Sequence, residues 1–205
     1  MNYYAEGSID KKIRELFFPD FEYKGTMVEV GAGPAVYISM SKHFRENGWR
    51  CISVDPNPKF VEQHRILGHE IYPFACSNET KKGQFKIIQA PNTHIEINDG
   101  CSWSAIDTRY VYPSNAKVET IDVDIITLDT LLESIHVDKI DFLSVDTEGW
   151  EIDVMKGFDH NKYQPKVILL ENINDDPKYR SYMSSIGYKL EIRKEYNEIY
   201  TKIKL

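Results

Sequence analysis

Residues 28–37, "VEVGAGPAVY", decide the fold of this chain. The apolar residues up to Val30 are typical of a buried strand, and the segment "GAGP" follows directly at 31–34. Its two glycines permit positive φ angles and let a ligand approach the main chain. Pro34 suits the first turn of a helix, because its missing N–H removes no intrahelical bond. The stretch predicts a strand, a helix start and a loop whose free N–H groups would face an anionic part of a ligand.

Short apolar runs alternate with amphipathic ones along the rest of the chain. We predict helices at 8–18, 35–48, 58–68, 150–158 and 176–187, and strands at 26–30, 51–55, 70–76, 83–89, 139–146 and 166–172. Residues 118–134 predict a strand followed by a short helix. Strands joined through helices indicate a parallel sheet. Two final strands, 188–194 and 197–205, have no helix between them and predict an antiparallel hairpin at the sheet edge. We expect one domain over 1–205 with an irregular insertion at about 77–117.

Composition excludes several classes of partner. The 205 residues include 25 Lys and Arg against 32 Asp and Glu, and no basic block occurs. Nucleic acid is not an expected partner, because such binding depends on neutralising phosphates. The N-terminus lacks the apolar core of a secretory signal, and no segment reaches the ~20 apolar residues that span a bilayer. Cys51, Cys76 and Cys101 are too far apart for a zinc pair. We expect a cytoplasmic protein without a membrane partner.

Two cofactors compete for the glycine loop. A dinucleotide fingerprint requires a third glycine where this chain has Val36. Asp55 ends the next predicted strand and suits the ribose hydroxyls of either NAD or S-adenosylmethionine. Glu29 would repel a pyrophosphate at short range but suits the ammonium and sulfonium charges of S-adenosylmethionine. We favour the methyl donor. A nicotinamide-dependent reductase and a plain turn with a solvated Glu29 remain alternatives.

Six segments within residues 26–173 together form a recognisable pattern: "VEVGAGPA", "SVDPNP", "PFACSN", "ITLDTLLE", "IDFLSVDTEGWEIDVMKGF" and "VILLEN". The pattern resembles the FkbM family of S-adenosylmethionine-dependent methyltransferases. The chain departs from the family pattern at Ala35, where many relatives have glycine, and at Glu29, where aspartate is common. The resemblance implies a Rossmann-like class I methyltransferase fold, α/β, with a mostly parallel seven-stranded sheet, an antiparallel edge hairpin and helices on both faces. It also implies O-methylation of a hydroxyl on a sugar, glycan or small metabolite.

The cofactor-binding residues follow from the loop, the ends of the next strands and the resemblance. We expect the methyl donor to contact Glu29, Gly31, Ala32, Gly33, Asp55, Pro56, Ala75, Cys76, Ser104 and Asp146. A non-catalytic module that binds the donor without transferring its methyl group stays open as an alternative.

A second set of polar residues lies at the ends of two later strands. Asp146 and Glu171 end predicted parallel strands, so both fall on the ligand-binding edge of the sheet. Asp146, Glu171 and Asn172 offer only oxygen ligands, which Mg²⁺ and Mn²⁺ prefer. Asp146 or Glu148 is alternatively the catalytic base that takes the acceptor's proton. A third interpretation is that both acids merely cap the helix beginning near Trp150.

The insertion contains two further candidates for the reaction. His94 is a catalytic base near its ordinary pKa or an ordinary surface histidine. Trp103 offers an apolar face that suits a sugar ring. Methylation of a nucleic-acid amine is disfavoured, because "DTEG" at 146–149 stands where such enzymes carry an Asn/Asp-Pro-Pro-Tyr element. The sequence predicts no oligomeric state.

Overall fold

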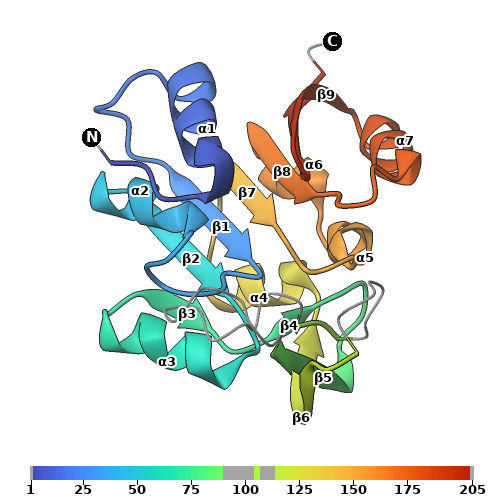
Figure 1. The fold of residues 1–205 in the computed structure, drawn as a ribbon. Helices are drawn as coiled ribbons and strands as arrows, with labels where there is room; N and C mark the ends of the chain where they lie inside the picture. Colours follow the sequence, from blue (N-terminus) through green and yellow to red (C-terminus); the bar gives the residue numbers. More distant parts are fainter. Residues whose placement is uncertain (1, 90–103, 107–113, 204–205) are drawn as a thin grey trace.

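The computed structural model describes residues 2–89, 104–106 and 114–203 (Figure 1). His94 and Trp103 lie outside the described residues. Among those described, no helix combines the length and the apolar character needed to cross a bilayer.

A seven-stranded sheet forms the centre of the molecule (Figure 1). Its order is β3 (Glu70–Tyr72), β2 (Arg50–Val54), β1 (Thr26–Val30), β7 (Phe142–Val145), β8 (Val167–Glu171), β10 (Asn197–Lys202) and β9 (Tyr188–Lys194). The first five strands are parallel, and β10 is antiparallel to both of its neighbours. The predicted parallel sheet with an antiparallel hairpin is confirmed. The strand order reverses between β1 and β7, which is where open α/β sheets bind their ligands.

Helices cover both faces of this sheet, as predicted. Alternate strand residues such as Met27 and Phe142 face α1 (Ile9–Phe17) and α2 (Met40–Glu46). The intervening residues, such as Val28 and Leu143, pack against helices on the other face. These helices are α4 (Leu128–Ser134), α5 (Glu151–Lys156), α6 (His160–Tyr163) and α7 (Pro177–Ser185). Since side chains alternate along a strand, each buried strand contributes to two separate cores.

A second, three-stranded sheet includes the one strand that was predicted inside the insertion, at 83–89. Its order is β4 (Ala75–Cys76), β6 (Lys117–Ile126) and β5 (Lys81–Gln89), and β5 runs antiparallel to β6 along its full length. Phe85 and Ile87 of β5 pack against Phe60 of α3 (Pro58–Ile66). The strand predicted at 70–76 is divided between the two sheets, because Pro73 has no N–H to continue a ladder.

The helix predicted at 35–48 begins only at Met40. Residues 31–39 form a loop in which Gly33 and Ile38 have φ angles of 58° and 46°. These angles are incompatible with a right-handed helix, so Pro34 belongs to the loop rather than to a first helical turn.

Candidate active site

Strand register aligns the predicted site residues along the carboxyl edge of the sheet. Val30 of β1 is paired with Val54 of β2 and with Val145 of β7. The residues that follow these three partners are Gly31, Asp55 and Asp146. Glu171 ends the adjacent strand β8. The four residues therefore lie on neighbouring strand ends, at the point where the strand order reverses.

A cavity of about 400 Å³ opens at this edge. Its wall includes all the residues predicted to contact the methyl donor, which are Glu29, Gly31, Ala32, Gly33, Asp55, Pro56, Ala75, Cys76, Ser104 and Asp146. Ser104 also accepts a hydrogen bond on Oγ from the Ile88 N–H at 3.2 Å. A cavity of this volume lies within the usual range for small-molecule sites.

The backbone N–H groups of the glycine loop already have partners within the protein. Gly31 and Ala32 donate to the Val54 carbonyl at 2.9 and 3.2 Å, and Gly33 donates to Asp55 Oδ2 at 2.9 Å. Ala35 donates to Gln63 Oε1 at 3.3 Å. The free N–H groups expected for an anion are therefore not present at these four residues, so they offer no donors to a pyrophosphate. This geometry counts against the nicotinamide alternative.

Asp55 is held so that it faces the cavity. Its Oδ1 accepts from the Asn57 N–H at 2.8 Å, and its Oδ2 accepts from Gly33. Burial leaves only 5% of the residue exposed and raises the pKa of the carboxyl to about 6. Each oxygen retains a lone pair for a further donor, such as a ribose hydroxyl.

The cavity wall beyond Asp55 is apolar. It is formed by Phe60 of α3, Phe85 of β5, Phe74 just before β4, and Ile106. The sequence alone marks these residues only as apolar, because nothing in their spacing separates a cavity wall from a core.

Glu29 is buried in the cavity wall rather than solvated. It accepts from the Ser41 N–H at 3.3 Å and from Ser53 Oγ at 3.5 Å, and the residue is 4% exposed. Burial raises the pKa of its carboxyl to about 7. A positively charged ligand group beside Glu29 would favour the ionised form and offset part of this cost.

Three carboxyl groups meet at the ends of β7 and β8. Asp146, Glu148 and Glu171 each place an oxygen within 4.8 Å of the others. Asp146 is exposed to the cavity, whereas Glu148 and Glu171 are half-buried. Loss of hydration among these packed groups is the main cause that raises the pKa of each carboxyl, to about 7 for Asp146 and about 9 for Glu148. The next cause is the charge of Glu151 for Asp146, and the charge of Asp146 for its two partners. The Oε2 atoms of Glu148 and Glu171 are buried without a hydrogen-bond partner. The cluster therefore favours bound protons or a cation.

Glu151, the first residue of α5 and not among the predicted site residues, holds the turn that precedes this helix. Its Oε1 accepts from the N–H groups of Thr147 at 2.8 Å and Gly149 at 3.1 Å, while Tyr179 Oη donates to Oε2 at 2.5 Å. The chain can fold back in this way because Glu148 and Gly149 have φ angles of 57° and 95°. The N-cap residue of α5 is Trp150, and no hydrogen bond of the described residues joins Asp146 or Glu148 to an N–H group of the helix, so the interpretation of both acids as simple caps is not supported.

The Asn172 side chain, predicted as a metal ligand, is engaged in the turn before α7. Its Oδ1 accepts from the Asp176 N–H at 2.8 Å, and its Nδ2 donates to the Asp176 carbonyl at 3.1 Å. Its own N–H donates to the Tyr196 carbonyl at 2.6 Å. These bonds hold the side chain in the turn before α7, and Glu148 is the third member of the cluster instead.

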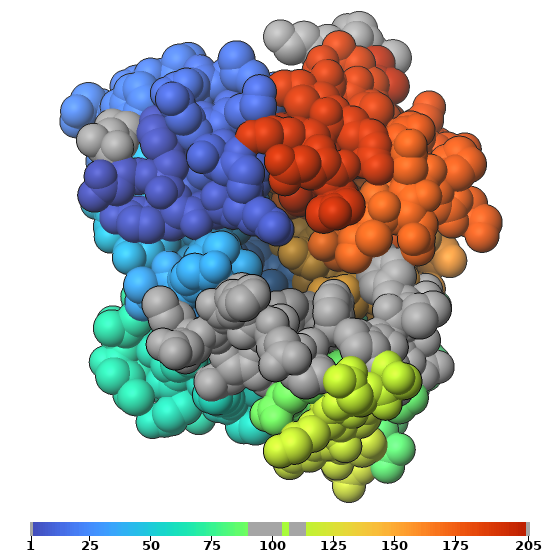
Figure 2. All heavy atoms as spheres, in the orientation of Figure 1, coloured from blue at the N-terminus to red at the C-terminus, as the bar shows by residue number. Residues whose placement is uncertain are grey.

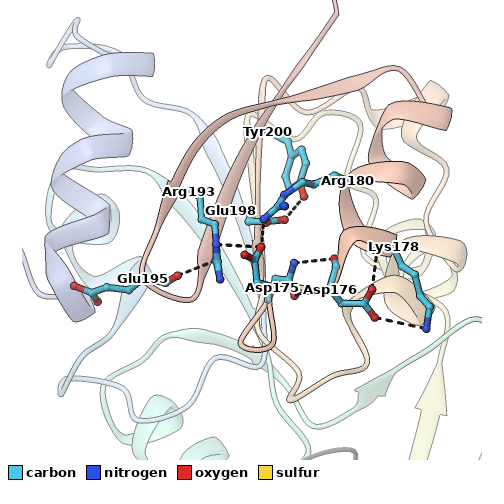
Figure 3. Close-up of polar contacts among 9 residues, drawn as sticks. Asp175, Asp176, Lys178, Arg180, Arg193, Glu195, Glu198 and Tyr200 are labelled. Atoms are coloured by element: carbon cyan, nitrogen blue, oxygen red, sulfur yellow. Dashed lines mark hydrogen bonds and ion pairs between the residues drawn. The ribbon is translucent and has the colours of Figure 1, made fainter.

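A network of charged side chains supports the cavity beside β8 (Figure 3). Arg180 of α7 donates from Nε to Glu198 Oε1 at 2.9 Å and also pairs with Asp175. Arg193 of β9 approaches the same Asp175 oxygen at 3.3 Å. The network fixes the loop before α7 and the β9–β10 hairpin. These two segments contribute Ile173, Tyr196 and Asn197 to the cavity wall, which the sequence analysis did not identify.

The N-terminal segment also reaches the cavity. Ala5, Glu6 and Ile9 line it, and Glu6 belongs to the short helix η1 (Glu6–Ser8). The Lys194 ammonium donates to the Gly7 carbonyl, and Figure 2 shows the N-terminal segment and the C-terminal hairpin side by side. The negative charge of Glu6 contributes to the raised pKa of Asp146. No local sequence signal indicates this placement, because the two segments meet only in the folded chain.

Comparisons with known proteins agree with this architecture. Residues 29–190 match the model of the methyltransferase FkbM domain. The methyltransferase FkbM of Methylobacillus flagellatus KT has a similar structure, with a TM-score of 0.56 and 12% sequence identity over 91% of this chain. This chain spans 47% of that protein's length, or about half.

A second solved structure and the curated proteins complete the comparison. Precorrin 8w decarboxylase of Methanobacterium thermoautotrophicum has a TM-score of 0.49 and 11% identity over 98% of this chain and 97% of its own. No curated protein matches the sequence. The match to the domain model covers most of the chain, from the acidic residue before the glycine loop to the first strand of the C-terminal hairpin. The chain therefore belongs to the methyltransferase FkbM domain family.

Proposed function

We propose that the protein is an S-adenosylmethionine-dependent O-methyltransferase that acts on a hydroxyl of a sugar, a glycan or another small metabolite. Family membership supports methyl transfer. The observation that carries the proposal is the juxtaposition of the glycine loop with the Asp146, Glu148 and Glu171 carboxyls in one cavity. One part of the cavity suits an adenosine-bearing cofactor, and the other supplies groups that accept a proton.

The residues present fit the cofactor. Asp55 would hold the ribose hydroxyls, and Phe60 and Phe85 would flank the adenine as apolar wall. Glu29 would face the positively charged end of the cofactor. A positive charge there would favour the ionised form of this buried carboxyl. The cofactor would supply an electrophilic methyl group bound to a sulfonium.

The acceptor requires a group that removes its hydroxyl proton. A pKa of about 7 lets Asp146 accept a proton near neutral pH, and its side chain faces the cavity. Asp146 would accept the hydroxyl proton on a carboxylate oxygen as the acceptor takes the methyl group that the cofactor would supply. A positioned base contributes about 10²–10⁴-fold to the rate.

A divalent cation, Mg²⁺ or Mn²⁺, is a second candidate partner for the same cluster. The oxygen-only donor set and the two buried, unpaired Oε2 atoms fit such an ion. Asp146, Glu148 and Glu171 would hold it, and it would lower the pKa of a bound hydroxyl. Under this alternative the carboxyls orient the acceptor rather than take its proton directly.

The experiment that tests the proposal separates binding from transfer. Calorimetry should detect S-adenosylmethionine binding and no NAD binding. Incubation with methyl-labelled donor and a panel of glycans and small alcohols should then label a hydroxyl compound. Asp146→Asn should reduce that turnover by about 10²-fold or more when the donor is saturating. Donor binding without transfer to any acceptor would favour the non-catalytic module, and NAD binding would favour the reductase.

A further inference from the structure

The carboxyl of Glu29 is contacted by the helix that packs on its strand. α2 lies against β1 and β2 (Figure 1). Ser41, in the first turn of α2, donates its N–H to Glu29 Oε1 at 3.3 Å. Arg45 follows one helical turn later and lies on the same side of α2, because residues four apart share a helix face. The helix therefore directs an amide and a guanidinium toward the same two strands.

The Ser53 hydroxyl connects Arg45 with Glu29. Ser53 of β2 is fully buried and is paired with Glu29 of β1 in the sheet. Arg45 Nη2 donates to Ser53 Oγ at 3.1 Å, and Ser53 Oγ donates to Glu29 Oε2 at 3.5 Å. A hydroxyl has one proton to donate and lone pairs that accept, so both bonds can form together. Because the guanidinium can only donate, it directs the Ser53 proton toward Glu29.

The charge of Arg45 also favours the ionised form of Glu29. Burial raises the pKa of this carboxyl to about 7, whereas hydrogen bonds from Ser41 and the positive charge of Arg45 oppose the rise. A guanidinium keeps its charge at every pH at which proteins are normally studied, so this support does not vary with pH. Since Glu29 lines the cavity, its carboxylate is available to a positively charged group of a ligand.

We infer that Arg45 is a positioning residue, which holds the Glu29 carboxylate, through the Ser53 hydroxyl, for the positively charged end of S-adenosylmethionine. The inference rests on the proposed function, because it concerns a residue behind the same cofactor site. Arg45 is not among the described residues of the cavity wall, so it acts on the donor through other side chains.

Other titratable groups near this pair set the conditions of the test. The described groups that interact with the charge of Glu29 or Arg45 are Cys51, Asp55, His64, His69 and Asp146. Burial raises the pKa of Cys51 to about 12 and that of Asp55 to about 6. Burial and then the charge of Arg45 lower the pKa of both histidines to about 4. Asp146, with a pKa of about 7, titrates together with Glu29, so a background without Glu29 is needed to separate the two.

Carboxyl-carbon NMR of the cofactor-free protein tests the link between Arg45 and Glu29. The Glu29 signal is assigned by its loss in Glu29→Gln. Arg45→Met should move the titration midpoint of this signal to higher pH, because the carboxylate loses a supporting cation. Arg65→Met is the matched control: Arg65 also lies in the last turn of a helix, but it is exposed, and its loss should leave the midpoint unchanged. An unchanged midpoint in Arg45→Met, or equal movement in both variants, would overturn the inference.

Two further variants separate the interaction from a general loss of structure. Arg45→Lys retains the positive charge and should restore most of the original midpoint of Glu29. Ser53→Ala removes the connecting hydroxyl and should move the midpoint in the same direction as Arg45→Met. A midpoint that Ser53→Ala leaves unchanged would contradict the proposed connection.

Calorimetry with S-adenosylmethionine tests the consequence for the cofactor. At pH 7 Arg45→Met should weaken binding by about tenfold, the effect of one pKa unit, and the ratio of the two dissociation constants should fall toward one by about pH 9. In a Glu29→Gln background, Arg45→Met should have no pH-dependent effect. A ratio that is the same at every pH would indicate a structural role and overturn the inference. Absence of donor binding to the unaltered protein would refute the proposed function, whereas the NMR titration would still decide whether Arg45 controls Glu29.

Discussion

Gly31 packs directly against the main chain of Asp146: a Cβ atom at position 31 would lie 1.7 Å from the Asp146 carbonyl oxygen. The contact joins the loop proposed to bind the methyl donor to the strand end that carries the proposed base. Gly31 also has a φ angle of 79°, which favours glycine. The glycine therefore serves close approach between two strands as well as approach of a ligand.

We predict that Gly31→Ala destabilises the protein more than Gly33→Ala. Both residues have positive φ angles, but a Cβ at Gly33 meets nothing within 4 Å. Strain alone costs about 1–2 kcal/mol, and the steric conflict at Gly31 adds about 1–3 kcal/mol. Urea denaturation of both variants measures the difference. Equal losses would show that the backbone relaxes around Asp146.

Asp55→Asn should weaken S-adenosylmethionine binding by about 10- to 150-fold, which corresponds to the 1.5–3 kcal/mol of hydrogen bonds to a charged group. Calorimetry measures the dissociation constant. Asp138→Asn, at an exposed position outside the cavity wall, provides the control and should leave the affinity unchanged. Retained affinity in the Asp55 variant would remove this carboxylate from the ribose site.

The stability of the cofactor-free protein should fall as the pH rises from about 4.5 to about 7, in part because of Glu29. Burial raises the pKa of this carboxyl from 4.5 to about 7, so the folded state binds the proton more tightly than the unfolded state within that interval. The contribution is present in full below the unfolded pKa and is lost as the pH rises through the folded pKa. The Glu29→Gln variant has no ionisable side chain at this position, so its free energy of unfolding should depend less on pH. An unchanged slope would contradict this assignment.

Binding of Mn²⁺ distinguishes the two interpretations of the carboxyl cluster. If the cluster holds a cation, Glu148→Gln should weaken Mn²⁺ binding about tenfold or more, as loss of a charged ligand does, whereas Asn172→Ala should leave it unchanged. Electron paramagnetic resonance measures the free ion. Once an acceptor is known, full turnover in excess EDTA would exclude the metal and leave Asp146 as the base.

Arg180→Met should destabilise the protein by about 2–4 kcal/mol, because it leaves Glu198 buried without its cationic partner (Figure 3). Glu198 is fully buried, whereas 35% of the Arg180 side chain is exposed, which places the loss toward the lower part of the range for buried pairs. Lys178→Met removes an exposed pair with Asp176 and should cost at most about 1 kcal/mol. Thermal unfolding measures both. A double variant with Glu198→Gln should recover part of the loss, and no recovery would mean that Arg180 acts through packing.

Local patterns were sufficient to predict most of the fold. The alternation of apolar runs with amphipathic segments indicated the parallel sheet, and the helix-free segment before the last strand indicated the antiparallel hairpin. Turn chemistry was harder to predict. The helix expected from residue 35 begins at Met40, because Ile38 takes a left-handed conformation that its residue type does not signal. The second sheet was also missed as a unit, since the pairing of β5 with β6 joins residues far apart in the chain.

The sequence by itself determined that Asp55, Asp146 and Glu171 share one edge, because parallel strands place their carboxyl ends together. Tertiary structure alone decided where the side chains point. Asn172 has an oxygen ligand and the expected position, yet its amide binds the turn at Asp176, while Glu148 turns inward through a positive φ angle. Glu6 joins the cavity through contacts of the N-terminal segment with distant residues, including the bond from the Lys194 ammonium to the Gly7 carbonyl. Strand periodicity encodes position along an edge, whereas side-chain direction and contacts between distant segments depend on packing of the whole chain.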